Sequence, residues 1–141
     1  IEIVAKSNLP YILMHNKKIA QKKNVTKQIK IDLQKKIDLL IDNGFNTNNL
    51  IIDPGIGFNK NTEQNIEIIS NLDKLKFGFP ILIGTSRKKH IGDVLGTDVN
   101  DRIEGTAATT AIAIAKGADI IRVHDVKEMT RVAKMTDALI R

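Results

Sequence analysis

A carboxylate, Asp53, lies between a short apolar run, 50–52, and the turn residues Pro54 and Gly55. The run is typical of a buried strand, and neither proline nor glycine extends one. We therefore expect Asp53 at the carboxyl end of a strand, where parallel α/β folds collect ligands. Two roles stay open on this evidence: Asp53 binds a ligand, or it only caps the turn, as Asp before Pro often does.

Two cationic groups follow other apolar runs. The segment 84–90, GTSRKKH, holds three successive cationic residues, so it suits an anionic or polar ligand or forms a solvated loop. Arg122 and His124 lie two residues apart at the end of the run 120–123, and strand alternation would place them on one face. A guanidinium beside an imidazole suits a phosphate. Alternatively, Arg122 forms a structural ion pair with an acid of a neighbouring strand, Asp53 included.

Four strands are expected, because short apolar runs recur between polar turns. They cover 11–15, 50–52, 81–83 and 120–123. In the first strand, the period of two places Ile12 and Met14 on one face and Leu13 and His15 on the other.

Amphipathic helices are expected between the strands. The first starts near Asn24, ends at Gly44, and has apolar residues every three or four positions: Val25, Ile29, Leu33, Ile37 and Leu40. Thr62 is expected to cap the helix that follows Asp53. That helix is expected to bury Ile66, Ile69 and Leu72.

The last two expected helices differ in character. One starts near Asn100 and is rich in small residues up to Gly117, which permits close approach of another backbone. In the other, Asp125 and Glu128 match a capping box, so Asp125 is expected to be a cap rather than a catalyst. The buried face of this closing helix is expected to hold Val126, Met129, Val132, Ala133 and Leu139.

The composition fits one domain, with 141 residues and 42% hydrophobic content. Zero cysteines exclude disulfides, thiolate metal sites and a cysteine nucleophile. No apolar run approaches the ~18 residues of a membrane span, and no signal peptide is visible. We therefore expect a cytoplasmic protein without a membrane partner. The chain begins with Ile rather than Met, so we expect a piece of a longer protein.

The net charge of +6 is unevenly distributed, because the segment 17–36 holds eight lysines and one aspartate. That segment contains no aromatic residue and no Gly-rich or zinc element, so a nucleic-acid-binding module is not indicated. We expect these lysines on a solvated helix face.

Four strands alternating with helices predict the α/β class, with a parallel sheet and right-handed crossovers. Four βα units form either a small open sheet or half of a (β/α)₈ barrel, which typically has ~250 residues. The candidate polar residues all fall at strand ends, as a barrel requires. The residues at the strand ends predict a polar pocket that accepts phosphate, without indicating a particular substrate.

Five motifs taken together resemble the carboxyl-terminal half of dihydropteroate synthase, a family of pterin-binding TIM barrels. They are LMHN at 13–16, DPGIGF at 53–58, GTSRK at 84–88, EGT at 104–106 and RVHDV at 122–126. Their order and spacing match over nearly the whole chain. The resemblance implies that residues 1–141 form the carboxyl-terminal half of a single (β/α)₈ barrel domain, strands 5–8, with the first half absent from this chain.

The same resemblance implies a transferase of folate biosynthesis. The family condenses 6-hydroxymethyl-7,8-dihydropterin diphosphate with p-aminobenzoate to give 7,8-dihydropteroate and diphosphate, and sulfonamides compete as p-aminobenzoate analogues. It implies Mg²⁺ as cofactor, with its ligand expected from the missing amino-terminal half and no metal ligand in this fragment. It also implies a homodimer of the complete protein, and activity only in the complete chain.

Residue by residue, the resemblance assigns catalytic roles to Asp53, Lys88 and Arg122. Pterin-binding residues by the same comparison are Met14, Asp53, Gly57, Phe58, Gly84, Lys88 and Arg122. The p-aminobenzoate side would be lined by Phe58, Lys88 and Lys89, and the diphosphate would face Arg122 and His124. Two positions depart from the family pattern: Lys89 replaces a frequent Ser, and Asn59 replaces a frequent small residue.

Two alternatives stay open. The first is the pterin domain of a methyltetrahydrofolate–corrinoid methyltransferase, against which the GTSRK and RVHDV motifs argue. The second is a non-catalytic half-barrel that binds a pterin or serves in assembly.

Overall fold

The computed structural model describes residues 2–7, 9–20 and 23–141. Its strands are β1 (Tyr11–Met14), β2 (Leu50–Asp53), β3 (Leu82–Ile83) and β4 (Ile120–Ile121). Its helices are α1 (Glu2–Ser7), α2 (Val25–Asp42), α3 (Thr62–Ser70), α4 (Lys89–Leu95), α5 (Ile103–Ala115) and α6 (Val126–Ile140). Short 3₁₀ helices cover Thr47–Asn49 and Leu72–Leu75.

All strand pairs are parallel, as predicted. β1 pairs with β2 in a register that places Tyr11 opposite Leu50 and Met14 opposite Asp53. β3 pairs with β4, and a parallel bridge between Ile52 and Ile81 joins the two pairs. The strands therefore lie side by side in chain order, and their carboxyl ends meet at one edge.

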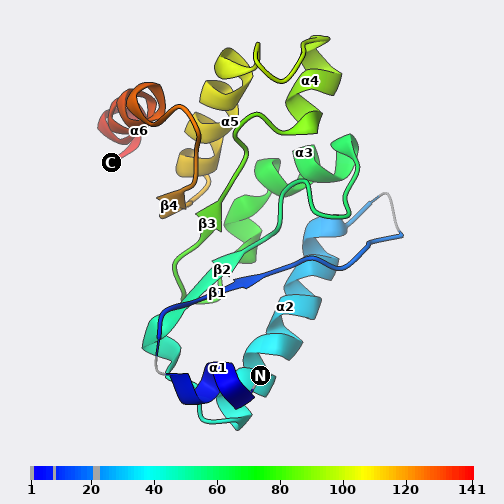
Figure 1. Cartoon of the computed structure of the whole chain (residues 1–141), viewed down its shortest axis with the longest axis vertical. Coiled ribbons are helices and arrows are strands. Elements are labelled where there is room, and N and C mark those ends of the chain that lie inside the picture. The colour runs from blue at the N-terminus through cyan, green and yellow to red at the C-terminus, as the bar shows by residue number, and fades with distance from the viewer. Residues whose placement is uncertain (1, 8, 21–22) are drawn as a thin grey trace.

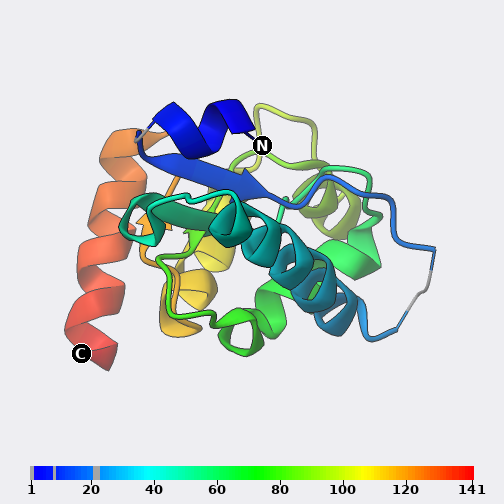
Figure 2. The same ribbon diagram turned by 90° about the horizontal axis from the view of Figure 1, so that it is seen from below.

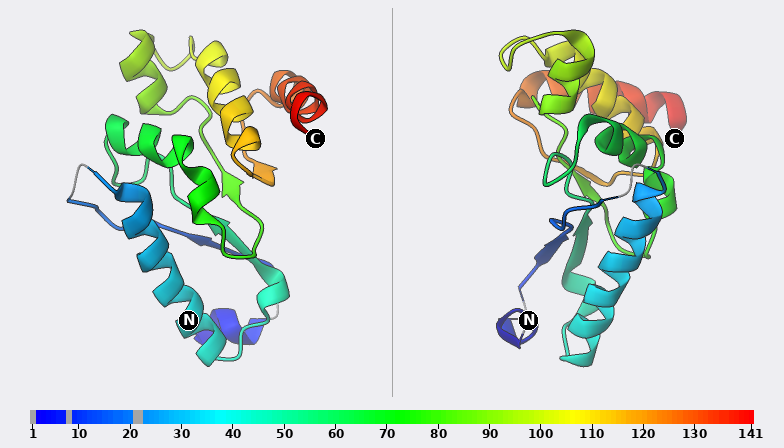
Figure 3. Two further views of the ribbon diagram at one scale, coloured as in Figure 1. Left: turned by 180° about the vertical axis from the view of Figure 1, so that it is seen from behind. Right: turned by 90° about the vertical axis from the view of Figure 1, so that its right-hand side faces the viewer.

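The hydrophobic core lies between the strands and the helices. Figure 1 shows β1 and β2 in front of α2, whereas the view from behind in Figure 3 shows α2 and α3 in front of the strands. These helices therefore cover one face of the sheet. Leu13 faces them and is buried, while its neighbour Ile12 on the opposite face is 44% exposed, which confirms the predicted alternation.

Helix α2 confirms the prediction from periodicity. It begins at Val25 and ends at Asp42, and Gly44 follows with φ of 78°. Its buried apolar residues are the five expected ones, Val25, Ile29, Leu33, Ile37 and Leu40. The left-handed conformation suits glycine directly after a helix.

Helices α3 and α4 correct three expectations. Asn61, not Thr62, is the N-cap of α3, because its side chain accepts from the Gln64 N–H and Gln64 returns a bond in a capping box. Ile66 is 42% exposed, although Ile69 is buried as expected. The polar segment expected over 84–90 ends at Lys88, since α4 begins at Lys89.

In the last part of the chain, the strand is shorter and the helix is more exposed than expected. β4 ends at Ile121, so Arg122 lies beyond the strand. In α6, Met129 is buried, but Val126 is 63% and Leu139 is 72% exposed. Helix α6 packs mainly on α5 and lies at one edge of the molecule, away from α2 (Figure 2). Within the described parts of the chain, no helix combines the length and apolarity that a membrane crossing needs.

Candidate functional site

Asp53 is held at the carboxyl end of β2 and is only 3% exposed. Its Oδ1 accepts from the Gly55 N–H at 2.7 Å, and its backbone carbonyl accepts from the His15 N–H at 2.9 Å. Burial raises the pKa of this carboxyl, while the Gly55 N–H and the charges of Arg122, Lys60 and Lys88 oppose the rise. Asp53 thus caps the turn, as one hypothesis held, and remains a buried carboxylate among cations.

Lys88 extends from the end of the β3 loop over the β2 loop. Its Nζ lies 4.6 Å from the centroid of the Phe58 ring. A Cβ added to Gly57, which has φ of 80°, would lie 3.0 Å from Lys88 Cδ, so glycine admits the lysine stem. Burial and the Arg122 charge lower the pKa of Lys88, and Asp53 opposes them.

Arg122 lies against Gly84 at the end of β3. A Cβ on Gly84 would be 3.3 Å from Arg122 Nη2 and 3.4 Å from Nε, so the guanidinium covers the glycine. The Arg122 N–H donates to the Ile83 carbonyl at 3.0 Å, which continues the β3–β4 pairing past the strand. Among the described residues, no ion pair joins Arg122 to Asp53, so the alternative of a direct structural pair is wrong.

The loops after β3 and β4 are tied to each other. Ser86 Oγ lies 2.9 Å from His124 Nδ1. Arg87 donates to Asp125 from Nε at 3.1 Å and from Nη2 at 2.6 Å. The Asp125 side chain makes no cap hydrogen bond to α6, so the expected capping box is wrong. Its carboxylate is engaged by the guanidinium instead, which lowers the pKa of Asp125.

We expect Arg87 and Asp125 to act as one unit. Because the contact is bidentate, Arg87→Ala or Asp125→Ala alone should destabilise the chain nearly as much as both together. Urea denaturation of the parent chain, the two single variants and the double variant measures the coupling free energy between Arg87 and Asp125. Lys89 and Asp93, an exposed pair at 3.8 Å, provide the matched control, for which near-additive effects are expected. Additive effects at Arg87 and Asp125 would contradict the prediction.

The sheet register brings most of the predicted residues together. Asp53, Gly57, Phe58, Gly84, Lys88 and Arg122 are linked by the contacts above, and half-buried Met14 pairs with Asp53 across β1 and β2. His124 joins through Ser86. Lys89 lies apart on α4, where it is exposed and pairs with Asp93.

Some polar residues of this region carried no signal in the sequence. Lys60 donates to three backbone carbonyls, and burial lowers its pKa to about 8. His90, the last residue of the segment 84–90, is buried in α4, and burial lowers its pKa to about 4, so its ring is neutral at pH 7. Among the residues that the structure covers, no three His, Cys, Asp or Glu side chains gather as a metal site.

The chain is similar to known pterin-binding proteins. A family model described as "Pterin binding enzyme" matches residues 1–124. The dihydropteroate synthase of Clostridium beijerinckii is 50% identical over 142 residues, which cover 99% of this chain and 53% of that protein. That of Bacillus subtilis is 40% identical over 139 residues, 98% of this chain and 49% of that protein. The chain therefore spans about half the length of the curated relatives it matches.

Solved structures give the same result. The Clostridium difficile dihydropteroate synthase, determined in the presence of pteroic acid, superposes with a TM-score of 0.93 at 42% identity. The match covers 99% of this chain and 54% of that one. The Yersinia pestis enzyme in a sulfonamide drug complex gives 0.90 at 34% identity, over 96% of this chain and 52% of that one.

Proposed function

Because this chain belongs to the family of pterin-binding enzymes, we propose that it is the carboxyl-terminal half of a dihydropteroate synthase. Residues 1–141 supply strands 5–8 of one (β/α)₈ barrel domain, and the complete barrel joins the pterin diphosphate to p-aminobenzoate. The observation that carries this proposal is the buried carboxylate of Asp53 at the end of β2, with Lys88 and Arg122 following the neighbouring strands β3 and β4. One anion and two cations at a common sheet edge suit a pterin on one side and a diphosphate on the other.

In the proposed complex, Asp53 accepts hydrogen bonds from the 2-amino group and the adjacent ring N–H of the pterin. Arg122 stacks on the pterin plane, since Gly84 beneath it leaves room for close approach. With His124, Arg122 also faces the diphosphate. Lys88 reaches the polar pterin edge and, with Phe58 and Lys89, borders the p-aminobenzoate side.

The reaction follows from charge. The bond between the pterin methylene and the diphosphate oxygen breaks, and positive charge spreads into the heterocycle. The negative charge of Asp53 stabilises that cation, and the cationic side chains stabilise the departing diphosphate. The p-aminobenzoate amine then attacks the methylene carbon and loses a proton. An aniline nitrogen is largely unprotonated near neutral pH, so no strong general base is required.

The proposal extends to sulfonamides as competitors of p-aminobenzoate and to a homodimer of the complete protein. Mg²⁺ belongs to it as an ion that the other half of the barrel would hold. No step of the proposed reaction is assigned to that ion.

A hybrid enzyme tests the proposal. In this hybrid barrel, the chain replaces the segment of the Clostridium beijerinckii enzyme that it matches. We expect the hybrid barrel to form dihydropteroate and release diphosphate, because 50% identity over the matched segment preserves the packing between halves. A pterin-dependent reaction without diphosphate release would favour the methyltransferase. A folded hybrid that gives no heat with the pterin diphosphate in calorimetry would favour a non-catalytic module that serves in assembly.

A further inference from the structure

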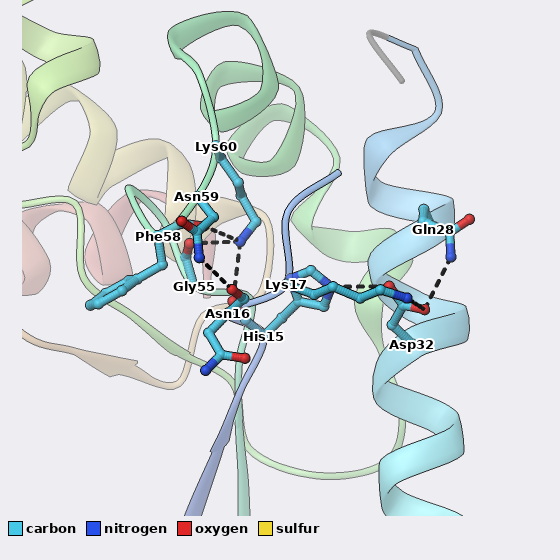
Figure 4. A network of polar contacts seen from close by, with 9 residues as sticks. All are labelled: His15, Asn16, Lys17, Gln28, Asp32, Gly55, Phe58, Asn59 and Lys60. Atoms are coloured by element: carbon cyan, nitrogen blue, oxygen red, sulfur yellow. Dashed lines mark hydrogen bonds and ion pairs between the residues drawn. The ribbon is translucent and has the colours of Figure 1, made fainter. Parts of the chain in front are cut away.

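The ammonium group of Lys60 is enclosed by three backbone carbonyls. Its Nζ lies 3.1 Å from the His15 oxygen, 3.0 Å from the Gly55 oxygen and 3.0 Å from the Phe58 oxygen. Figure 4 shows the three contacts converging on the one nitrogen. An ammonium has three N–H donors, so each of them has an acceptor here.

The three carbonyls come from two segments that are distant in sequence. His15 follows β1, whereas Gly55 and Phe58 belong to the loop after β2. Glycine is required at position 55, because a Cβ there would lie 1.9 Å from the His15 oxygen. Gly55 therefore permits the close approach of the two backbone segments at the place where the Lys60 ammonium binds carbonyls of both.

The segment that follows β1 is itself held in place by contacts with α2. The His15 ring is fully buried, and its Nε2 lies 3.2 Å from Asp32 Oδ2 on α2. Gln28 donates to the other Asp32 oxygen at 3.1 Å. Asn59 adds a second tie between the segments, since its Nδ2 donates to the Asn16 carbonyl at 2.7 Å. Lys60 thus joins the loop after β2 to the segment after β1, which other contacts already hold in place (Figure 4).

We propose that Lys60 is a positioning residue, whose ammonium holds the loop 54–59 against the end of β1 and so sets Gly57 and Phe58 relative to Asp53. The link to pterin binding rests on the proposed function. The effect on the loop does not, because it can be measured without a ligand. Lys60 acts through backbone carbonyls, and no contact between its ammonium and a substrate is invoked.

Amide hydrogen exchange of the 141-residue chain tests the effect on the loop. The N–H groups of Gly55, Gly57 and Phe58 all donate within this region. In Lys60→Met, we expect these three amides to exchange about tenfold faster or more, while those of Leu33 and Ile37 in the α2 core keep their protection. Lys35→Met, which removes an exposed lysine of α2, should change none of them.

Restoring an amine at position 60 shows whether loop protection depends on the ammonium group or on the volume of the side chain. The chain has no cysteine, so aminoethylation of Lys60→Cys places a lysine-like amine at this position alone. We expect this product to regain loop protection, whereas the carboxamidomethylated Lys60→Cys does not. If Lys60→Met does not fold, Lys60→Gln, with two N–H donors, is measured in the same way. Unchanged loop protection, or an equal loss at Leu33 and Ile37, overturns the proposal.

Pteroic acid titrated into the hybrid barrel tests the link to binding. With Lys60 intact, binding supports the proposed function, and its absence counts against that function while leaving the exchange result valid. In the Lys60→Met hybrid barrel, we expect affinity to fall by about tenfold. Equal affinity despite a loosened loop would overturn the link.

Discussion

Asp53→Asn should lower kcat/KM of the hybrid barrel by about 10²–10³-fold, the range observed when one preorganised electrostatic partner of a transition state is removed. Asparagine retains an oxygen for the Gly55 N–H, so the turn is kept while the negative charge is lost. Dihydropteroate formation measures the effect. An unchanged kcat/KM would eliminate the catalytic role of Asp53.

The same substitution should leave the chain more stable at pH 7, which separates lost function from misfolding. Burial raises the pKa of Asp53. A carboxyl whose pKa is higher when folded favours folding most below its ordinary pKa of about 3.9. That contribution is lost as the pH rises through the folded pKa. Urea denaturation should therefore give Asp53→Asn a higher free energy of unfolding than the parent chain at pH 7. This difference should become smaller as the pH is lowered. A less stable variant at pH 7 would contradict this sign.

Gly55→Ala is expected to be the most destabilising single-methyl change in the loop. Gly55 has φ of 73°, and the added Cβ would lie 1.9 Å from the His15 carbonyl oxygen, a backbone atom that cannot rotate away. The left-handed conformation costs alanine about 1–2 kcal/mol. Forced overlap adds about 1–3 kcal/mol. Urea denaturation should therefore show a loss of about 2–5 kcal/mol.

Gly44→Ala is the matched control. Gly44 has a similar φ of 78°, but nothing lies within 4 Å of its added Cβ. It should show only the conformational cost of about 1–2 kcal/mol. Equal losses in the two variants would mean that the carbonyl contact contributes nothing.

Local patterns were sufficient for the order of the four strands and of α2, α3, α5 and α6, although they did not predict α1 and α4. They also placed most residues of the candidate site near strand ends. The spacing of Val25, Ile29, Leu33 and Ile37 predicted α2, because a helix repeats its buried face every three or four residues. Asp53 was placed at a strand end because Pro54 and Gly55 stop a strand. The motifs then indicated that Lys88 and Arg122 belong to the same site.

Local patterns failed where a side chain has a distant competitor for its hydrogen bonds. Asp125 and Glu128 matched a capping box, but Arg87, 38 positions away, engages the Asp125 carboxylate instead. The apolar Val126 and Leu139 were expected to be buried, but α6 packs mainly on α5, and both remain exposed.

The sequence by itself therefore determined the alternation of strands and helices and the strand-end positions of the polar residues, because both depend on neighbours within a few positions. It also determined the family resemblance, through the order and spacing of short motifs along the chain. Only the tertiary structure decided what Lys60 contacts. In the sequence it is one of many lysines, yet parallel pairing of β1 with β2 brings the carbonyl of His15, 45 positions away, to its ammonium. Sheet order sets such contacts, and no local spacing encodes them.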